Sequence, residues 1–449
     1  MRELKFYLIT DTHFFKNSLG ARGEEYDKFM RFEQKCFAET ENINRSVFDW
    51  LKTADEADIV LIAGDLSFNG EKESHLGFIE LLKELKASGK KIFVVTADHD
   101  FKVAPFAFDE TGRLTPEGTK RDELFDLYYD YGFGEAIAID RKHLSYVAQL
   151  GEGVRLLALN NDYDGREYDE EQLEWIKEQA QKAKDDGQIM FAMNHYPLLP
   201  GQPLFSVIPS AVQKNSSAVT TMLADLGVHL VFTGHMHNQS INLKVTPSGS
   251  KFYDVCTGSI IADPAIIRHV TIKEDNTVDI KSIPTPDFEW DTNGKGCKQY
   301  LSDMFDSMIL NMLSDMKDNP KSLLSRFGAG DKKGLYPVVK TAGRLLDRLT
   351  VGGVCRLMWI GCEDKELKRM KLKNYATELV RGIFEGNQTF KEGTPKGDVF
   401  LKFLKRINFV LKKINVKTID GTPADMFDIL KNTAGNYDID DYNATLNLI

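Results

Sequence analysis

The chain of 449 residues contains no run of eighteen or more consecutive apolar residues, which argues against an ordinary membrane-spanning helix. Cysteine is scarce: there are five, an odd number at wide spacings, so reduced thiols are expected in place of a disulfide framework. The first residues, MRELKFYLITD, lack the layout of a secretory signal peptide. We therefore expect a cytoplasmic protein, or a secreted or surface protein if a leader preceded this sequence.

Positive charge is scarce in the first two thirds of the chain. Residues 291–449 carry 26 Lys and Arg against 20 Asp and Glu, a net charge of +6, and since the whole chain carries −10, the first 290 residues carry −16. An acidic body with a basic appendage argues against broad nucleic-acid binding by the body. The simplest interpretation is two solvated surfaces of opposite sign that attract each other.

Short apolar segments alternate with amphipathic helical patterns in the first 240 residues. The predicted strands are 4–10, 58–63, 91–96, 154–160, 189–194 and 229–233. The clearest helical patterns lie at 42–53, 74–88, 169–186 and 212–226. After residue 240 strands follow one another without helices. This order predicts an α/β layered domain, with a mixed sheet or a two-sheet sandwich flanked by helices.

A segment rich in proline, glycine and polar residues, 283–296, predicts a domain boundary. We expect one domain at 1–285 and a mainly α-helical domain at 286–449. The plainest amphipathic stretch of the second domain is 400–414, which either packs on a neighbouring helix, as we favour, or lies on a membrane surface.

Aspartate and histidine follow the predicted strands at five places. The candidate residues are Asp11 and His13, Asp65, Asp98 to Asp100, His195, and His235 with His237. Ligands of open α/β sheets bind outside the carboxyl ends of the strands. Carboxylate and imidazole donors suit Mn, Fe, Zn and similar ions. Two such ions can clamp a phosphoryl group and generate hydroxide between them, which requires a bridging carboxylate, and Asp65 is our candidate for it.

The blocks Asp11-Thr-His13, Gly64-Asp65, Ala97 to Asp100, Asn194-His195 and Gly234-His235-x-His237 resemble the five-block signature of calcineurin-like metallophosphoesterases. The resemblance covers roughly residues 4–280. It is nearest to bacterial class III cyclic-nucleotide phosphodiesterase-like proteins, through the stretch from Gly64 to His75 and the later EAIAIDRKHLSYV. It implies a four-layer β-sandwich flanked by helices, followed by a helical extension.

The resemblance also implies roles for the candidate residues. The first metal ion would be held by Asp11, His13, Asp65 and His237, and the second by Asp65, Asp98, His195 and His235. His99 would face the phosphate as general acid or charge stabiliser, and Asp100 would orient its ring. The implied reaction is attack of a metal-bound hydroxide on phosphorus in a small phosphodiester, with a cyclic nucleotide as one candidate. The sequence specifies neither the metals nor the oligomeric state.

The third block departs from the family pattern, because Ala97-Asp98 stands where Gly-Asn is usual. Asp98 keeps a ligand oxygen but adds a negative charge and loses a donor. Ala97 restricts the backbone if the turn requires a positive φ. We expect an active site with altered metal or substrate preference. A phosphomonoesterase is the next alternative, and an attenuated site that binds metal or nucleotide without turnover is another.

Other polar residues near these blocks have weaker support. His75 either lines the substrate pocket or begins a helix at the surface. Asn194 and Tyr196 flank a predicted ligand, so either could contact phosphate, although Tyr196 before proline favours a packing role. The segment Asn160 to Asp162, at the end of a predicted strand, either reaches the substrate or, as we favour, forms a turn.

Overall fold

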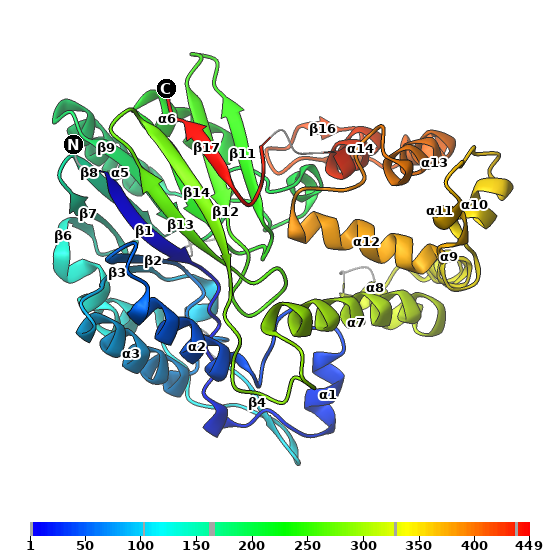
Figure 1. Cartoon of the computed structure of the whole chain (residues 1–449), viewed down its shortest axis with the longest axis horizontal. Helices are drawn as coiled ribbons and strands as arrows, with labels where there is room; N and C mark the ends of the chain where they lie inside the picture. Colours follow the sequence, from blue (N-terminus) through cyan, green and yellow to red (C-terminus); the bar gives the residue numbers. More distant parts are fainter. Residues whose placement is uncertain (1–2, 102–103, 161–166, 327–329, 436–438) are drawn as a thin grey trace.

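The computed structural model of the protein describes residues 3–101, 104–160, 167–326, 330–435 and 439–449 (Figure 1). Asn161 and Asp162 of the predicted turn lie outside these ranges. Two β-sheets face each other, and helices cover both outer surfaces, so the α/β part of the molecule has four layers. A helical region follows it in the sequence. The predicted fold class is confirmed.

The first sheet has six strands in the order β17-β14-β13-β1-β2-β3. Their bounds are β1 Leu4–Ile9, β2 Ile59–Ala63, β3 Lys91–Val95, β13 Ile266–Ile272, β14 Thr277–Pro284 and β17 Ala444–Asn447. β1, β2 and β3 are parallel, whereas β13, β14 and β17 pair antiparallel. Every residue of β2 is buried, as expected for a central strand that is covered on both faces.

The second sheet has seven strands in the order β11-β12-β10-β9-β8-β7-β6. Their bounds are β6 Ala136–Asp140, β7 Ser145–Gly151, β8 Val154–Leu159, β9 Ile189–Asn194, β10 Val228–Thr233, β11 Ser240–Val245 and β12 Lys251–Cys256. β8, β9, β10 and β12 run parallel, and antiparallel strands lie on either side of them. β6 and β7 were not among the predicted strands. β6 is an edge strand, and its exposed residues include Ile137 and Ile139.

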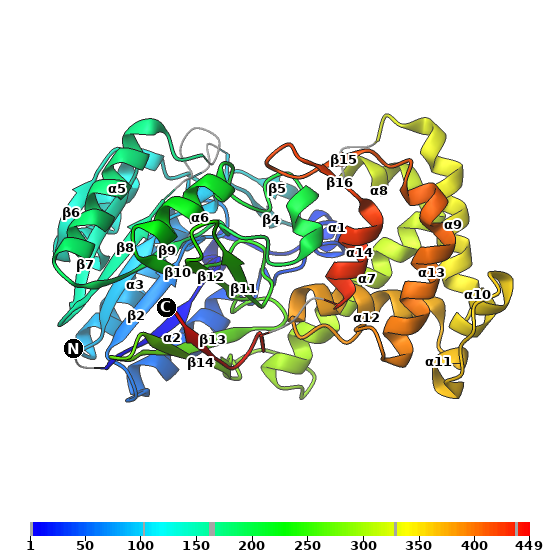
Figure 2. The same cartoon turned by 90° about the horizontal axis from the view of Figure 1, so that it is seen from above.

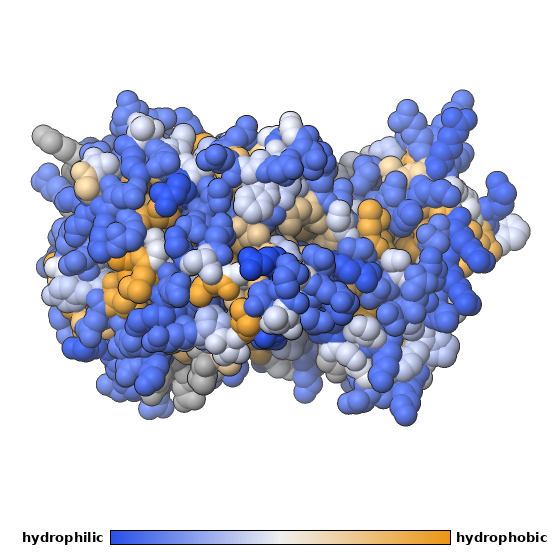
Figure 3. Space-filling view, turned by 90° about the horizontal axis from the view of Figure 1, so that it is seen from below, coloured by the Kyte–Doolittle hydropathy of each residue, from blue (hydrophilic) through white to orange (hydrophobic). Residues whose placement is uncertain are grey.

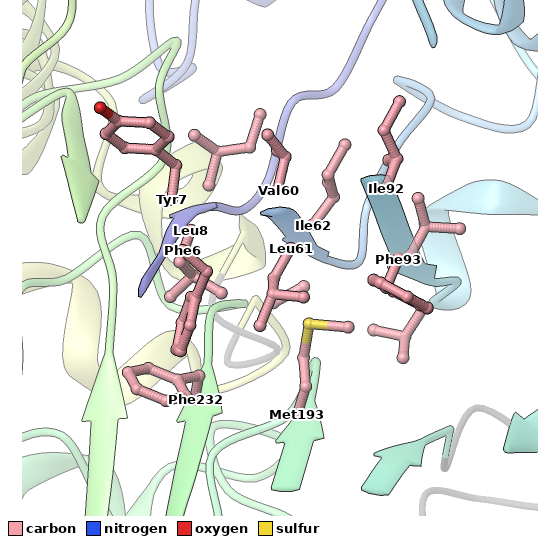
Figure 4. Packing of buried hydrophobic residues seen from close by; sticks show 14 of the residues in the cluster. Phe6, Tyr7, Leu8, Val60, Leu61, Ile62, Ile92, Phe93, Met193 and Phe232 are labelled. Atoms are coloured by element: carbon pink, nitrogen blue, oxygen red, sulfur yellow. The ribbon is translucent and has the colours of Figure 1, made fainter. Parts of the chain in front are cut away.

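Aromatic side chains fill the space between the two sheets. The ring of Phe6 lies 5.4 Å from the ring of Phe232, which comes from the opposite sheet (Figure 4). The ring of Phe191, also from the opposite sheet, lies 5.4 Å from that of Phe6. The outer layers are α2 (Thr40–Thr53) and α3 (Lys72–Ala87) on the first sheet, and α5 (Glu170–Asp185) and α6 (Ser216–Asp225) on the second. Burial of this continuous apolar interior fixes the positions of the strand ends.

The chain after residue 296 is mainly helical and lies beside the α/β part (Figure 2). Its helices are α7 Cys297–Asp318, α8 Pro320–Arg326, α9 Tyr336–Arg348, α10 Val351–Leu357, α11 Lys365–Arg369, α12 Leu372–Glu385, α13 Pro395–Leu411 and α14 Met426–Gly435. A hairpin of β15 (Val416–Lys417) and β16 (Pro423–Ala424) separates α13 from α14. The chain then returns to the first sheet as β17, a crossing that the sequence analysis did not predict.

Shorter elements occupy the connections of the α/β part. They are α1 Glu24–Met30, β4 Ala107–Asp109, β5 Gly112–Leu114 and α4 Leu124–Leu127. Within the described ranges, no helix is long and apolar enough to cross a membrane. The face in Figure 3 is mostly hydrophilic, with apolar patches over both halves of the molecule.

Candidate metal centre

The carboxyl ends of five strands meet and carry all of the predicted metal ligands. The ligands are Asp11 and His13 after β1, Asp65 after β2, Asp98 after β3, His195 after β9, and His235 with His237 after β10. Since β1 to β3 are parallel in one sheet, and β9 and β10 in the other, their ends share one edge of the sandwich. The sequence-based expectation that these residues converge agrees with this geometry.

Five of these seven residues have a left-handed backbone, which non-glycine residues rarely adopt. They are Asp11 at φ +50°, His13 at +38°, Asp65 at +51°, His235 at +71° and His237 at +51°. Such conformations cost about 1 kcal/mol or more each and persist where the surrounding structure holds them. Hydrogen bonds between loops do so here, for example from the amide of Asp11 to the carbonyl of Gly64 at 3.0 Å. The fold therefore stores strain to aim these side chains inward.

The ligand atoms fall into overlapping groups within 4.8 Å of one another. The first ligand group is Asp11, His13 and His237, and the second ligand group is Asp65, Asp98, His195 and His235. A third group, His13, Asp65 and His99, overlaps both. One carboxylate oxygen of Asp65 lies 3.1 Å from Nε2 of His195 and 3.6 Å from Nε2 of His13. Asp65 thus touches both halves of the cluster, which is the position a bridging ligand requires.

Backbone carbonyl groups orient two of the imidazole rings. Nδ1 of His195 lies 2.8 Å from the carbonyl oxygen of Ala63, so Nε2 faces Asp65. Nε2 of His235 lies 2.8 Å from the carbonyl oxygen of Ser210, which leaves Nδ1 for the cluster. A ring nitrogen that donates to a carbonyl group fixes the tautomer and makes the other nitrogen a better ligand.

Electrostatics within the cluster keep its carboxylates charged. Burial raises the pKa of Asp65, but the nearby histidines, His195 first, more than offset this and hold that pKa well below its usual range. Burial alone lowers the pKa of His195, whereas Asp65 and Asp11 raise it to about 10. Buried carboxylates need a cationic partner, either a protonated histidine or a metal ion. The donor set therefore fits divalent or trivalent ions with oxygen and imidazole preferences.

Asp100 organises the loop after β3 through its backbone. The carboxylate accepts hydrogen bonds of 2.8 Å from the amides of Ala97 and Ser67. We expected Asp100 to orient the ring of His99, but Nδ1 of His99 lies 2.6 Å from the carbonyl oxygen of Phe68. The ring is thus oriented by the loop after β2, and Asp100 positions the chain that carries it.

The two departures at 97 and 98 have different structural consequences. Ala97 has φ −143°, an extended conformation, so its methyl group imposes no strain on the turn. Asp98 is in the second ligand group, and its Oδ1 accepts a hydrogen bond of 2.5 Å from the hydroxyl of Tyr196. Burial and Asp65 raise the pKa of Asp98, yet His99, Tyr196 and His235 together lower it below its ordinary value. The site therefore carries a third negative charge.

His75 and Asn194, both candidates for substrate contact, are fully buried. The ring nitrogens of His75 lie 2.7 Å from the hydroxyl of Tyr128 and 2.8 Å from the carbonyl oxygen of Asp100. The amide nitrogen of Asn194 donates to the carbonyl oxygen of Tyr196 at 2.6 Å. Both side chains thus hold loops of the site in place. Their nitrogens are hydrogen-bonded within the protein and do not face a substrate.

Asp254 is a supporting residue that the sequence analysis missed. Its carboxylate accepts from the amides of Leu198 and Leu199 at 2.6 and 2.8 Å, and from the hydroxyl of Thr233 at 2.6 Å. These donors lie in the loop that follows His195 and in the strand that precedes His235. One fully buried carboxylate therefore connects the two segments that hold the ligands His195 and His235. The only signal in the sequence is an aspartate inside the apolar run KFYDVC.

Lys35 is a second residue that the sequence analysis missed. It is 7% exposed, and its Nζ lies 3.5 Å from Nδ1 of His13 and 4.6 Å from the centre of the Phe68 ring. It comes from an irregular loop between α1 and α2, where no periodicity or motif marks it. A buried ammonium group here adds positive charge beside the first ligand group.

Solved structures that are similar to this chain have low sequence identity. Among solved structures, a dimetal phosphatase from Danio rerio has 15% identity and a TM-score of 0.46, over 62% of this chain and 95% of that chain. A purple acid phosphatase from yellow lupin has 15% identity and a TM-score of 0.44, over 63% and 52%. Likenesses at this level carry no information about substrate.

Curated proteins gave no match to the sequence. The family model described as calcineurin-like phosphoesterase matches residues 4–239, more than half of the chain, and spans all seven predicted metal ligands. The chain belongs to the calcineurin-like phosphoesterase family.

Proposed function

We propose that this phosphoesterase hydrolyses a small phosphodiester, with cyclic nucleotides among the candidates, at a centre of two metal ions. The observation that carries the proposal is the position of Asp65 between the two halves of the cluster. We assign the first ion to Asp11, His13, Asp65 and His237, and the second to Asp65, Asp98, His195 and His235. When bound, two ions of Mn, Fe or Zn supply Lewis acidity that activates water and polarises the phosphoryl group.

His99 is the residue that we assign to the leaving group. The carbonyl oxygen of Phe68, 2.6 Å from Nδ1, orients the ring of His99, and the ring of His13 lies 4.9 Å away. In hydrolysis, water adds its oxygen to phosphorus while the ester P–O bond breaks. The departing oxygen takes up a proton, and His99 either donates that proton or stabilises the developing charge.

The third carboxylate favours one alternative. Asp98 strengthens the attraction for cations but repels an anionic phosphoester. The hydroxyl of Tyr196 holds the Asp98 carboxylate at the site. An attenuated protein that binds metal or nucleotide without turnover is therefore the second candidate. A phosphomonoesterase has the same ligands and differs only in the groups that surround the phosphate.

Hydrolysis after metal loading tests the proposal. Metal-stripped protein is reloaded with Mn(II), and the rates on bis-para-nitrophenyl phosphate and para-nitrophenyl phosphate are compared. We expect the diester to be the better substrate. The Asp98→Asn variant is measured in parallel, because the amide keeps the ligand oxygen and removes the charge.

Each result selects one candidate. Faster turnover of the monoester contradicts the diesterase proposal and supports a phosphomonoesterase. Turnover only in Asp98→Asn indicates that the natural site is attenuated. Absence of turnover in both proteins with Mn, Fe and Zn would remove the hydrolase proposal.

A further inference from the structure

The second part of the loop between β9 and α6, residues 203–215, connects the helical region to the metal centre. The amide of Leu204 donates to the hydroxyl of Thr433 in α14 at 2.9 Å, and the amide of Ile419 donates to the carbonyl of Ser206 at 2.8 Å. This loop is therefore fixed from one side by α14 and by the turn of the β15–β16 hairpin.

The other side of the same loop touches a metal ligand. The carbonyl oxygen of Ser210 lies 2.8 Å from Nε2 of His235. Met236, the next residue, packs in one apolar cluster with Val212, Phe384 and Ile419. The helical region thus builds directly on the loop that carries His235 and His237, so it shapes the surroundings of the centre.

A cavity of about 570 Å³ opens between this loop and the hairpin, with Ser210 in its wall. Its apolar lining comes from Val207, Pro209, Val212 and Ile419. Two cations, Lys214 from the loop and Lys417 from β15, line it as well. Within the described part of the chain, neither lysine forms an ion pair or a side-chain hydrogen bond.

We propose that this cavity binds one ester arm of the substrate, and that the arm combines an apolar, aryl-like or base-like surface with a second negative charge. The inference rests on the proposed phosphodiesterase function and selects, among the candidate substrates, a diester with two separate ester groups over a cyclic nucleotide. Apolar walls favour an arm with little polarity, and ammonium groups without carboxylate partners attract an anion. Both lysines are exposed, and Lys214 lies in the α/β part, whose net charge is negative.

Two matched diesters test the charge preference. Para-nitrophenyl phenyl phosphate carries one negative charge, whereas para-nitrophenyl para-carboxyphenyl phosphate carries two, and both release the same chromophore. The selectivity is the ratio of kcat/KM for the carboxylated diester to that for the neutral-arm diester. The variants Lys214→Met and Lys417→Met remove charge but keep the aliphatic chain. Lys413→Met, at an exposed position of the helical region outside the cavity, is the matched control.

We expect each cavity variant to lower the selectivity about threefold, the double variant about tenfold, and Lys413→Met not to change it. The change should lie in KM, because the contact is equal in the ground state and the transition state. Added salt should lower the selectivity of the wild-type protein toward that of the double variant. Wild-type selectivity in the double variant would overturn the inference, while turnover of either diester would leave the proposed function standing.

A binding measurement covers the case without turnover. Calorimetric titration with para-carboxyphenyl phenyl phosphate compares the Mn-loaded wild-type protein and the double variant. Weaker binding by the double variant alone supports the cavity even if the hydrolase proposal fails. Equal affinities of the wild-type protein and the double variant for this diester would overturn the inference about the cavity.

Discussion

The hydroxyl of Tyr196 donates a hydrogen bond of 2.5 Å to Oδ1 of Asp98. This contact joins the loop after β9 in one sheet to the loop after β3 in the other. Asp98 is itself a ligand of the second group, and Tyr196 directly follows the ligand His195. The ring of Tyr196 lies 4.3 Å from that of His235. A residue for which the sequence favoured a packing role thus fixes the orientation of a ligand carboxylate.

Removal of this hydroxyl should weaken the second metal site. We expect Tyr196→Phe to lower the affinity for the second Mn(II) ion about tenfold, since partners of ligand carboxylates contribute 10- to 100-fold. Calorimetric titration of metal-free protein measures both affinities. Tyr253→Phe, which removes a hydroxyl bonded to Asn447 far along the chain, is the control. An equal loss of affinity for Mn(II) in both variants would mean that the loss does not depend on the bond to Asp98.

His99 should matter most for substrates with poor leaving groups. We expect His99→Asn to reduce kcat for a dialkyl diester, which must expel an alkoxide, about 100-fold, because general acid catalysis contributes 10²- to 10⁴-fold. Loss on bis-para-nitrophenyl phosphate should be smaller, since para-nitrophenolate leaves without a proton. His229→Asn, which removes a ring bonded to the carbonyl of Lys251, serves as the control. An equal loss on both substrates would instead indicate charge stabilisation.

Gly234 cannot carry a side chain without displacing a ligand. A Cβ atom there would lie 2.1 Å from Oγ1 of Thr10 and 2.3 Å from Oδ2 of Asp11. We expect Gly234→Ala to weaken Mn(II) binding at the first site at least about tenfold and to destabilise the fold by about 1–3 kcal/mol. Gly334→Ala, where no atom lies within 4 Å of the added Cβ, is the control for helix and loop effects. Unchanged metal affinity in Gly234→Ala would contradict the geometry.

Asp254 should make stability depend on pH. Burial raises its pKa to about 6, while its hydrogen bonds to Thr233, Leu199 and Leu198 partly oppose this. The folded state therefore favours the protonated carboxyl, so its contribution is complete below pH of about 4 and is lost as pH rises through about 6. The shift corresponds to about 3 kcal/mol.

Urea unfolding of the wild-type protein and of Asp254→Asn, both in chelator, measures this contribution. The amide does not titrate, so the difference in unfolding free energy between the two proteins isolates residue 254. We expect the wild-type protein to lose about 3 kcal/mol relative to the variant between pH 4 and pH 7. A difference that stays constant across this range would show that the carboxyl group is ionised in the folded protein throughout.

Local sequence determined much of the fold and the identity of the candidate ligands. The strands near Leu8, Leu61 and Val94 were predictable because a buried strand needs a continuous apolar run, and a polar residue must then lie where it ends. The Asp and His residues at those ends stand out because of their spacing. Short motifs of this kind depend on neighbouring residues alone.

Tertiary structure decided the supporting contacts. Asp254 and Lys35 reach the centre from separate segments, and no motif marks them. Tyr196 adjoins a predicted ligand in the sequence, but only the tertiary structure brings its hydroxyl to Asp98. The same holds for His75, whose place behind Asp100 follows from the packing of α3, and for the return of the chain as β17. Neighbouring residues determine which segments become strands and which side chains can bind metal. Contacts between distant segments determine what surrounds them, because burial and hydrogen bonding arise only when the two sheets and the helical region come together.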